Sequence, residues 1–139
     1  MADVRPYAPQ FHPDAAGPCE VGIDAIEPAR IAALVTRWGE RFLDRVFTPA
    51  ERAICRDRAT SLAARYAAKE AVSKALGTGV GAVAWREIEI LANERGRPVL
   101  VLHGAAARRA RDLGLNAWSV SLTHLAGVAL AVVAASAAP

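Results

Sequence analysis

The sequence is poor in cysteine and in aromatic residues. Its two cysteines, Cys19 and Cys55, have the spacing of neither a disulfide framework nor a set of thiolate metal ligands, so we expect a reducing, cytoplasmic setting. Aromatic residues make up only 6% of the 139 residues and hydrophobic residues 53%. The core must therefore consist mainly of alanine, valine, leucine and isoleucine. This apolar content excludes a disordered chain and predicts one folded domain.

The sequence also has no hydrophobic run long enough to span a membrane. The most apolar stretch, residues 125–139, falls short of the roughly 20 residues that a span needs. Residues 1–18 are polar and rich in proline, and no apolar run follows them, which excludes a secretory signal. We expect a flexible N-terminal arm over residues 1–18 and a single domain over residues 19–136.

Lysine is scarce, although the chain is basic. Of 17 basic residues only Lys69 and Lys74 are lysines, and the net charge is +3. The excess is concentrated between Arg30 and Lys69, where nine basic residues face four acidic ones. Such a region is either a solvated surface or a docking face for an acidic protein or a phosphate-bearing ligand. Nucleic acid is the weaker alternative because the region lacks interleaved aromatic residues.

Periodicity and capping signals predict the element order β-α-α-α-β-β-α-β-β, an α+β fold with antiparallel strands. A capping box at Thr48 predicts a short helix, and Thr60 or Ser61 is expected to cap a long one that ends near Leu76. Other helices are predicted from Pro28 to just before Gly39 and over residues 105–113. The predicted strands cover residues 19–24, 85–90, 98–103, 118–123 and 128–135.

The long predicted helix carries residues able to do chemistry. Tyr66, Glu70 and Lys74 recur every four residues and so share one face, with Ser73 beside them. A solvated ion pair between Glu70 and Lys74 is the plain interpretation. The helix leads directly into a glycine loop, Gly77-Thr78-Gly79, which either ends the helix or brings backbone amides close to phosphate oxygens.

Two further residues stand at predicted strand ends. Asp24 is either a turn or capping carboxylate or, together with Glu70, a ligand of Mg²⁺, which needs only one or two protein carboxylates. His124 is either a structural polar group or a proton acceptor at neutral pH. Ser121 and His124 do not form a credible catalytic triad, because no partner acid and no nucleophile elbow accompany them.

Three motifs, taken in order, resemble those of the holo-acyl-carrier-protein synthases, the small, single-domain 4′-phosphopantetheinyl transferases. The motifs are Gly22-Ile23-Asp24 with Arg30 downstream, the run from Ala64 to Gly79 (ARYAAKEAVSKALGTG), and Val120-Ser121-Leu122-Thr123-His124. The resemblance covers nearly the whole chain from Val21 to Ala135. It implies the phosphopantetheinyl transferase fold, an antiparallel sheet packed on a long helix.

The resemblance also implies an activity. Such an enzyme transfers the phosphopantetheine arm of coenzyme A to a serine of an apo acyl carrier protein and releases adenosine 3′,5′-bisphosphate. It uses a divalent metal, usually Mg²⁺, and is typically a homotrimer with its sites at subunit interfaces. The carrier protein would serve fatty-acid or polyketide synthesis.

The roles implied by the matching motifs are as follows. Asp24 and Glu70 would bind the metal, and Glu70, Lys74 and His124 would be catalytic. Contacts to coenzyme A would come from Arg30, Arg65, Ser73, Lys74, Gly77, Thr78, Gly79 and His124, of which Arg30, Arg65 and the glycine loop could instead contact the carrier protein. The serine proton would pass to Glu70 or to a metal-held water, with His124 as a positioning group or an alternative base. The rival interpretation is a non-catalytic module that binds carrier protein or coenzyme A.

Overall fold

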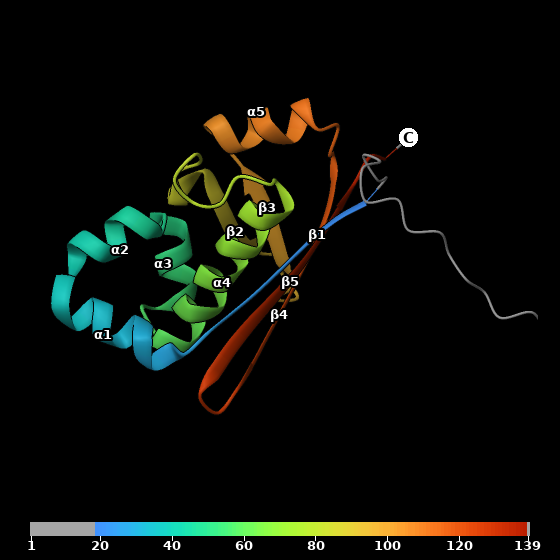
Figure 1. The fold of residues 1–139 in the computed structure, drawn as a ribbon. Helices are drawn as coiled ribbons and strands as arrows, with labels where there is room; N and C mark the ends of the chain where they lie inside the picture. Colours follow the sequence, from blue (N-terminus) through green and yellow to red (C-terminus); the bar gives the residue numbers. More distant parts are fainter. Residues whose placement is uncertain (1–18, 139) are drawn as a thin grey trace, which may run out of the picture.

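A long helix, α4 (Ala59–Ala75), runs through the middle of the molecule (Figure 1). A three-stranded sheet lies on one side of it and three short helices lie on the other. The computed structural model describes residues 19–138, and the arm predicted at residues 1–18 lies outside the described residues.

Both sheets are antiparallel, which confirms the predicted α+β fold. The larger sheet has the order β1-β5-β4, and its strands are β1 (Cys19–Ile26), β4 (Ala117–Leu125) and β5 (Val128–Ser136). The smaller sheet pairs β2 (Ile88–Ala92) with β3 (Pro98–Leu102), and helix α5 (Gly104–Asp112) follows it.

The helices opposite the large sheet are α1 (Pro28–Trp38), α2 (Glu40–Val46) and α3 (Pro49–Cys55). The sequence did not predict α2. Gly39, at φ 53°, ends α1 as expected, but the chain becomes helical again at the next residue, because Leu43 and Val46 bury one face of a second helix. The capping box of α3 is confirmed: the Glu51 amide donates to Thr48 Oγ1 at 3.2 Å.

Two predicted boundaries are wrong. Helix α4 begins at Ala59 and has Arg58 at its N-cap position, so neither Thr60 nor Ser61 caps it. The segment Trp85–Glu87 forms a 3₁₀ turn, η1, rather than the start of a strand. In that turn the Glu87 carboxylate accepts a hydrogen bond from the Ala84 amide, and this local bond competes with strand pairing.

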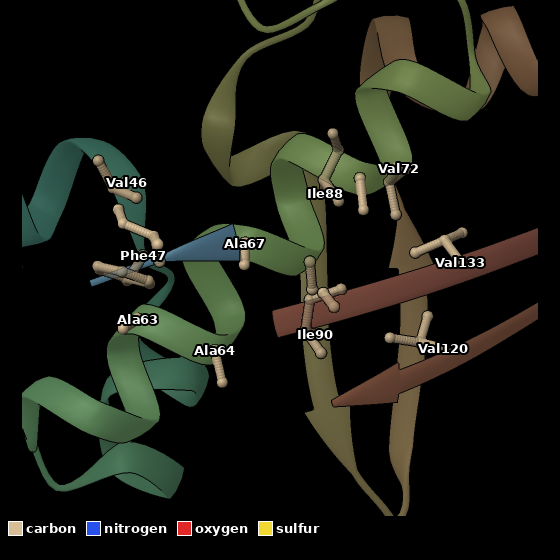
Figure 2. Packing of buried hydrophobic residues seen from close by; sticks show 14 of the residues in the cluster. Val46, Phe47, Ala63, Ala64, Ala67, Val72, Ile88, Ile90, Val120 and Val133 are labelled. Carbon is tan, nitrogen blue, oxygen red and sulfur yellow. The ribbon is translucent and has the colours of Figure 1, made fainter. Parts of the chain in front are cut away.

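The core contains mostly small side chains, as the composition predicted (Figure 2). Every inward residue of β5 from Ala129 to Ala135 is alanine or valine. The buried face of α4 is similarly rich in alanine. Small side chains on both surfaces allow the helix to lie close to the sheet.

The outer face of the large sheet exposes apolar side chains on β1 and β5, whereas Ser119, Ser121 and Thr123 make its β4 part polar. Val21 is 68% exposed, Ile23 56% and Val132 42%, and Leu125 at the end of β4 is 73% exposed. Exposed apolar residues gathered on one sheet face are typical of an interaction surface. Within residues 19–138, no helix has both the length and the apolar character required to cross a membrane.

Candidate functional site

Gly22 allows β1 to contact the backbone of α4. A Cβ atom built on Gly22 would lie 1.8 Å from the carbonyl oxygen of Ala71, so any other residue would push the strand and the helix apart. The contact lies two residues before Asp24 and one residue after Glu70. It therefore brings together two acidic residues that are far apart in the sequence.

Lys74 joins the two elements directly. Its Nζ donates to the backbone oxygen of Ile23 at 2.9 Å and lies 3.2 Å from Asp24 Oδ1. The plain interpretation, an ion pair between Glu70 and Lys74, is therefore wrong about the partner, since the carboxylate in ion-pair contact with Lys74 in this structure is that of Asp24. Lys74 is about half exposed, which leaves part of its ammonium group open to a ligand.

Asp24 and Glu70 lie in each other's electric field. Burial first, and then the negative charge of Asp24, raise the pKa of Glu70 above its ordinary value, while Lys74 and Arg30 act in the opposite direction. Two carboxylates held together at a partly buried point repel one another and attract a cation. Among residues 19–138 no group of three or more His, Cys, Asp and Glu side chains could hold a metal. The pair suits Mg²⁺, which takes one or two carboxylates and completes its shell with water and phosphate oxygens.

The glycine loop ends α4 rather than exposing free amides. The Gly77 amide donates to the carbonyl of Lys74, and the amides of Thr78 and Gly79 donate to that of Ser73. Gly77 and Gly79 have φ of 72° and 66°, which explains why glycine is required at both positions. Of the two interpretations of this loop, the helix stop is the one the structure shows. Ser73 is fully buried, and its hydroxyl donates to the Glu70 carbonyl at 2.7 Å.

Arg30 and Tyr66 connect the carboxylates to a cavity of about 510 Å³ between α1, α2, α4 and η1. Its lining is basic and aromatic, and besides Arg30 and Tyr66 it comprises Leu34, Trp38, Arg41, Phe42, Arg45, Val46 and Trp85. An acidic surface with a protruding apolar group would be complementary to this cavity.

The basic region from Arg30 to Lys69 is less cationic on its surface than the sequence predicted. Arg52 lies within 3.0 Å of carboxylate oxygens of Glu40, Asp44 and Asp57, which offset its charge. Arg65 is buried, and its Nε donates to the backbone oxygen of Ile90 at 3.1 Å. The exposed cations of this region lie on α1 and α2 and, as Arg56 and Arg58, between α3 and α4.

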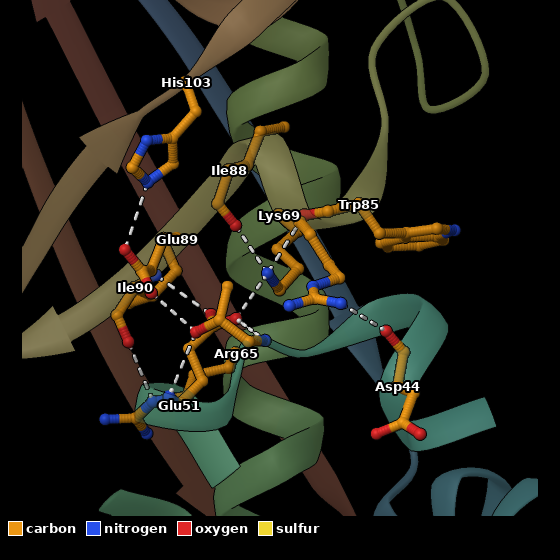
Figure 3. Close-up of polar contacts among 11 residues, drawn as sticks. Asp44, Glu51, Arg65, Lys69, Trp85, Ile88, Glu89, Ile90 and His103 are labelled. Carbon is orange, nitrogen blue, oxygen red and sulfur yellow. Dashed lines mark hydrogen bonds and ion pairs between the residues drawn. The ribbon is translucent and has the colours of Figure 1, made fainter. Parts of the chain in front are cut away.

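Lys69 is also buried, in a network that the sequence did not reveal (Figure 3). Its Nζ lies 2.8 Å from Glu51 Oε1 and donates to the backbone oxygens of Trp85 and Ile88. The other oxygen of Glu51 accepts from the Ile90 amide at 2.9 Å. Burial lowers the pKa of Lys69, and the charge of Glu51 opposes that change. The network ties α4 to α3, η1 and β2.

His124 does not meet the carboxylates within one chain. His124 of β4 pairs with Ala129 of β5, which pairs with Ile26 of β1. His124 and Asp24 are therefore two strand spacings apart across the sheet and two residues apart along the strands. Strand spacings put their Cα atoms about 12 Å apart. His124 instead lines an open hollow of about 610 Å³ with residues of α1, of the first turn of α4 and of the β4–β5 turn.

Sequence reasoning thus found the carboxylate pair and Lys74, but missed the role of Gly22 and the burial of Lys69. The glycine in Gly22-Ile23-Asp24 was the available signal for a close approach, since an isolated glycine inside a strand often marks one. As a whole, the site can hold a divalent cation and place a lysine beside it, and it opens toward a basic cavity. This combination suits transfer of a phosphate-linked group.

Known proteins are similar to the chain over most of its length. The model of the 4′-phosphopantetheinyl transferase superfamily matches residues 20–133. The holo-[acyl-carrier-protein] synthase of Herpetosiphon aurantiacus is 55% identical over 119 residues, which cover 81% of this chain and 94% of that protein.

Among solved structures, the holo-[acyl-carrier-protein] synthase of Helicobacter pylori in complex with coenzyme A superposes with a TM-score of 0.77 at 35% identity, covering 84% of this chain and 99% of that one. The synthase from Neisseria meningitidis gives the same TM-score at 33% identity, over 84% of this chain and 97% of its own.

Proposed function

The chain belongs to the 4′-phosphopantetheinyl transferase superfamily, and we propose that it transfers the 4′-phosphopantetheine group of coenzyme A to a serine of an apo acyl carrier protein. The serine oxygen forms a bond to the phosphorus that carries the pantetheine arm. The bond from that phosphorus to the bridging oxygen breaks, and adenosine 3′,5′-bisphosphate leaves with the electron pair. One observation carries the proposal: β1 and α4 bring Asp24, Glu70 and Lys74 to one point.

Asp24 and Glu70 would hold Mg²⁺. The donor set fits this ion, since it consists of two carboxylates from different elements and leaves room for phosphate oxygens. When bound, Mg²⁺ would offset the negative charge of the diphosphate.

Lys74 would contact the diphosphate as a point charge. It is anchored by the carbonyl of Ile23 and is half exposed, so its ammonium can move toward an added anion without unfolding α4. Because negative charge grows on the leaving bisphosphate, Lys74 stabilises the transition state more than the bound substrate.

The serine proton would pass to Glu70 or to a metal-held water. Burial and the charge of Asp24 raise the pKa of Glu70 while no cation is bound, and a bound cation would act in the opposite direction. His124 is the alternative base or a positioning group. Within one chain it lies too far from Asp24 to act there, so its role requires a neighbouring copy.

We propose a homotrimer, first because His124 needs a neighbouring copy to reach the carboxylates, and second because one sheet face exposes apolar side chains. The outer face of the large sheet exposes Val21, Ile23 and Val132, and burial of these side chains between copies would stabilise an oligomer. Light scattering on the purified chain tests the assembly. The original protein should have the mass of three chains, and Ile23→Lys should shift the mass toward that of one chain. A monomeric mass for the original protein would contradict the trimer.

The basic and aromatic cavity would receive the carrier protein. Arg41 and Arg45 of α2 line it, and so does Arg30, whose charge also acts on Glu70. Contacts to coenzyme A would come from Lys74, Thr78, the two loop glycines, Ser73, Arg30, Arg65 and His124. Several of these groups would have to change partner. The Arg65 Nε is bonded to Ile90, the Ser73 hydroxyl to Glu70, and the loop amides to carbonyls of α4. The proposal also places the reaction in the cytoplasm, on a carrier protein of fatty-acid or polyketide synthesis.

The test is an incubation of the protein with coenzyme A, Mg²⁺ and apo acyl carrier protein, followed by mass spectrometry. The carrier should gain the mass of one phosphopantetheine group, and Asp24→Asn or Glu70→Gln should abolish the gain. An unchanged mass across several carrier proteins would refute the transferase. If the original protein transferred nothing, and the carrier bound to both variants as tightly as to the original protein, the result would support the non-catalytic module.

A further inference from the structure

Tyr66 stands between the basic cavity and the carboxylate pair. It lines the cavity together with Arg30, and it precedes Glu70 by four residues on the same face of α4. Burial and then the charge of Glu70 raise the pKa of Tyr66; Asp24 adds to the effect and Arg30 opposes it. Tyr66 therefore belongs to the lining of the cavity and to the helix face that carries Glu70.

The ring of Tyr66 is held in place by Trp85. The two ring centroids are 4.6 Å apart with an interplanar angle of 31°. Trp85 is itself fixed, since its backbone oxygen accepts from Lys69 Nζ at 3.0 Å, within the buried network of Figure 3. That figure also shows the indole of Trp85 pointing away from Lys69. The buried Lys69 thus anchors the residue against which Tyr66 packs.

We propose that the hydroxyl of Tyr66 binds the acceptor serine and orients its oxygen toward the phosphorus, an inference that rests on the proposed function. The phenol O–H donates to the serine oxygen as the carrier docks, which leaves the serine O–H free to point toward Glu70, one helical turn further along. The remaining lone pair of the serine oxygen faces the phosphorus, and the serine proton passes to Glu70 as the bond to phosphorus forms. Tyr66 binds and orients the serine without taking its proton, and no covalent bond to the phenol forms.

The chemistry of the residue supports orientation rather than proton transfer. Burial and the Glu70 carboxylate raise the pKa of Tyr66 above its ordinary value, so the phenol is neutral at physiological pH. A neutral phenol both donates and accepts hydrogen bonds. Phenylalanine would keep the stacking on Trp85 but could not bind a hydroxyl.

The test is Tyr66→Phe, with kcat and KM for apo carrier protein measured at saturating coenzyme A and Mg²⁺. We expect kcat to fall about fivefold, the effect of losing one neutral hydrogen bond. The dissociation constant for coenzyme A, from titration calorimetry, should stay within about twofold, because the proposal gives Tyr66 no contact with that ligand. Tyr7→Phe, the same change at the chain's other tyrosine, is the matched control and should leave kcat unaltered.

Trp85→Ala supplies a second measurement. It removes the support of the Tyr66 ring, so kcat should fall in the original background and much less in the Tyr66→Phe background. Equal kcat in the Tyr66→Phe and original proteins would overturn the inference. Weakened coenzyme A binding would also overturn it, by assigning the phenol to that ligand. If the original protein modifies no carrier, the proposed function fails instead, so the two failures are distinguishable.

Discussion

The ammonium of Lys74 lies 3.2 Å from a carboxylate oxygen of Asp24, a residue fifty positions earlier in the sequence. This ion pair and the hydrogen bond from Lys74 to Ile23 attach the last turn of α4 to the end of β1. The lysine proposed to contact the diphosphate is therefore aligned by the same residue that is proposed to hold the metal.

Replacement of Lys74 by alanine should lower kcat about a hundredfold with a smaller effect on the dissociation constant of coenzyme A, because the charge it opposes develops in the transition state. Steady-state kinetics together with calorimetry measure both quantities. Lys74→Arg keeps the positive charge and should restore part of kcat. A raised KM with unchanged kcat would instead assign Lys74 to binding of the ground state.

Replacement of Gly22 by alanine should destabilise the fold by about 3 kcal/mol, at the upper end of overpacking effects, because the new methyl group meets backbone rather than a mobile side chain. Urea unfolding measures this loss. In the folded fraction, Mg²⁺ should bind more weakly, since the strand that carries Asp24 has moved from α4. Ala25→Ser adds an atom to the same strand on the exposed side and should change neither quantity, whereas equal effects of the two changes would argue against the contact.

The pKa of Glu70 should respond to its neighbours in opposite directions. Asp24→Asn removes a negative charge and should lower this pKa, while Lys74→Ala removes a positive charge and should raise it. Carbon-detected NMR titration of the Glu70 side chain checks both, with the distant Glu87→Gln variant as the control.

The raised pKa of Glu70 also makes the stability of the fold depend on pH. Because the folded-state pKa of Glu70 is raised, the folded protein binds this proton more tightly than the unfolded chain. The stabilisation is complete below the unfolded pKa, near 4.5, and is lost as the pH rises through the folded pKa. Glu70→Gln should flatten the plot of unfolding free energy against pH in this range. If Glu70 made the unfolding free energy of the original protein rise with pH there, the direction of its pKa shift would be contradicted.

The buried pair of Glu51 and Lys69 should be costly to break. Lys69→Met leaves the carboxylate of Glu51 buried without its cation, and we expect a loss of about 3–5 kcal/mol in unfolding free energy. Glu51→Leu combined with Lys69→Met should lose less than the sum of the two single changes, because no charge is left unpaired. A strictly additive result would show that the two groups do not interact.

Charge reversal on α2 should slow docking of an acidic carrier protein. Arg41→Glu or Arg45→Glu should lower the association rate about tenfold at low salt, and the difference should shrink as salt rises. Stopped-flow fluorescence measures the rate, and coenzyme A affinity should change little. Arg108→Glu, on the exposed side of α5, is the matched control. Equal slowing by the control would indicate a general effect of net charge.

Local patterns predicted most of the fold because each depends on residues that are close in sequence. The capping box at Thr48 and the helix end at Gly39 are such patterns, and both are confirmed. Helix α2 was missed because one glycine both ends α1 and precedes the next helix. The start of β2 was misplaced because alternation does not distinguish a strand from a 3₁₀ turn that leads into it.

The candidate site was predictable to the extent that it lies on one helix. Glu70 and Lys74 follow from their spacing. The pairing of Asp24 with Glu70 was one of two alternatives from the residues, which the resemblance to a family favoured, and the contact of Lys74 with Asp24, fifty residues away, was not predicted. Lys69 was counted as part of a basic surface because nothing in its neighbourhood shows that Glu51, eighteen residues earlier, lies buried beside it. Burial is decided by the tertiary fold, which a count of charges does not contain.

The alanine-rich contact between α4 and β5 also limits how the chain can evolve. An alanine side chain has no rotamers to freeze and no length to adjust, so the contact cannot absorb a larger neighbour by rearranging. Shrinkage to glycine within the helix costs about 1 kcal/mol. Substitutions should therefore accumulate on the solvent side of α1, α2 and α5, while the distance from α4 to the sheet is inherited almost unchanged.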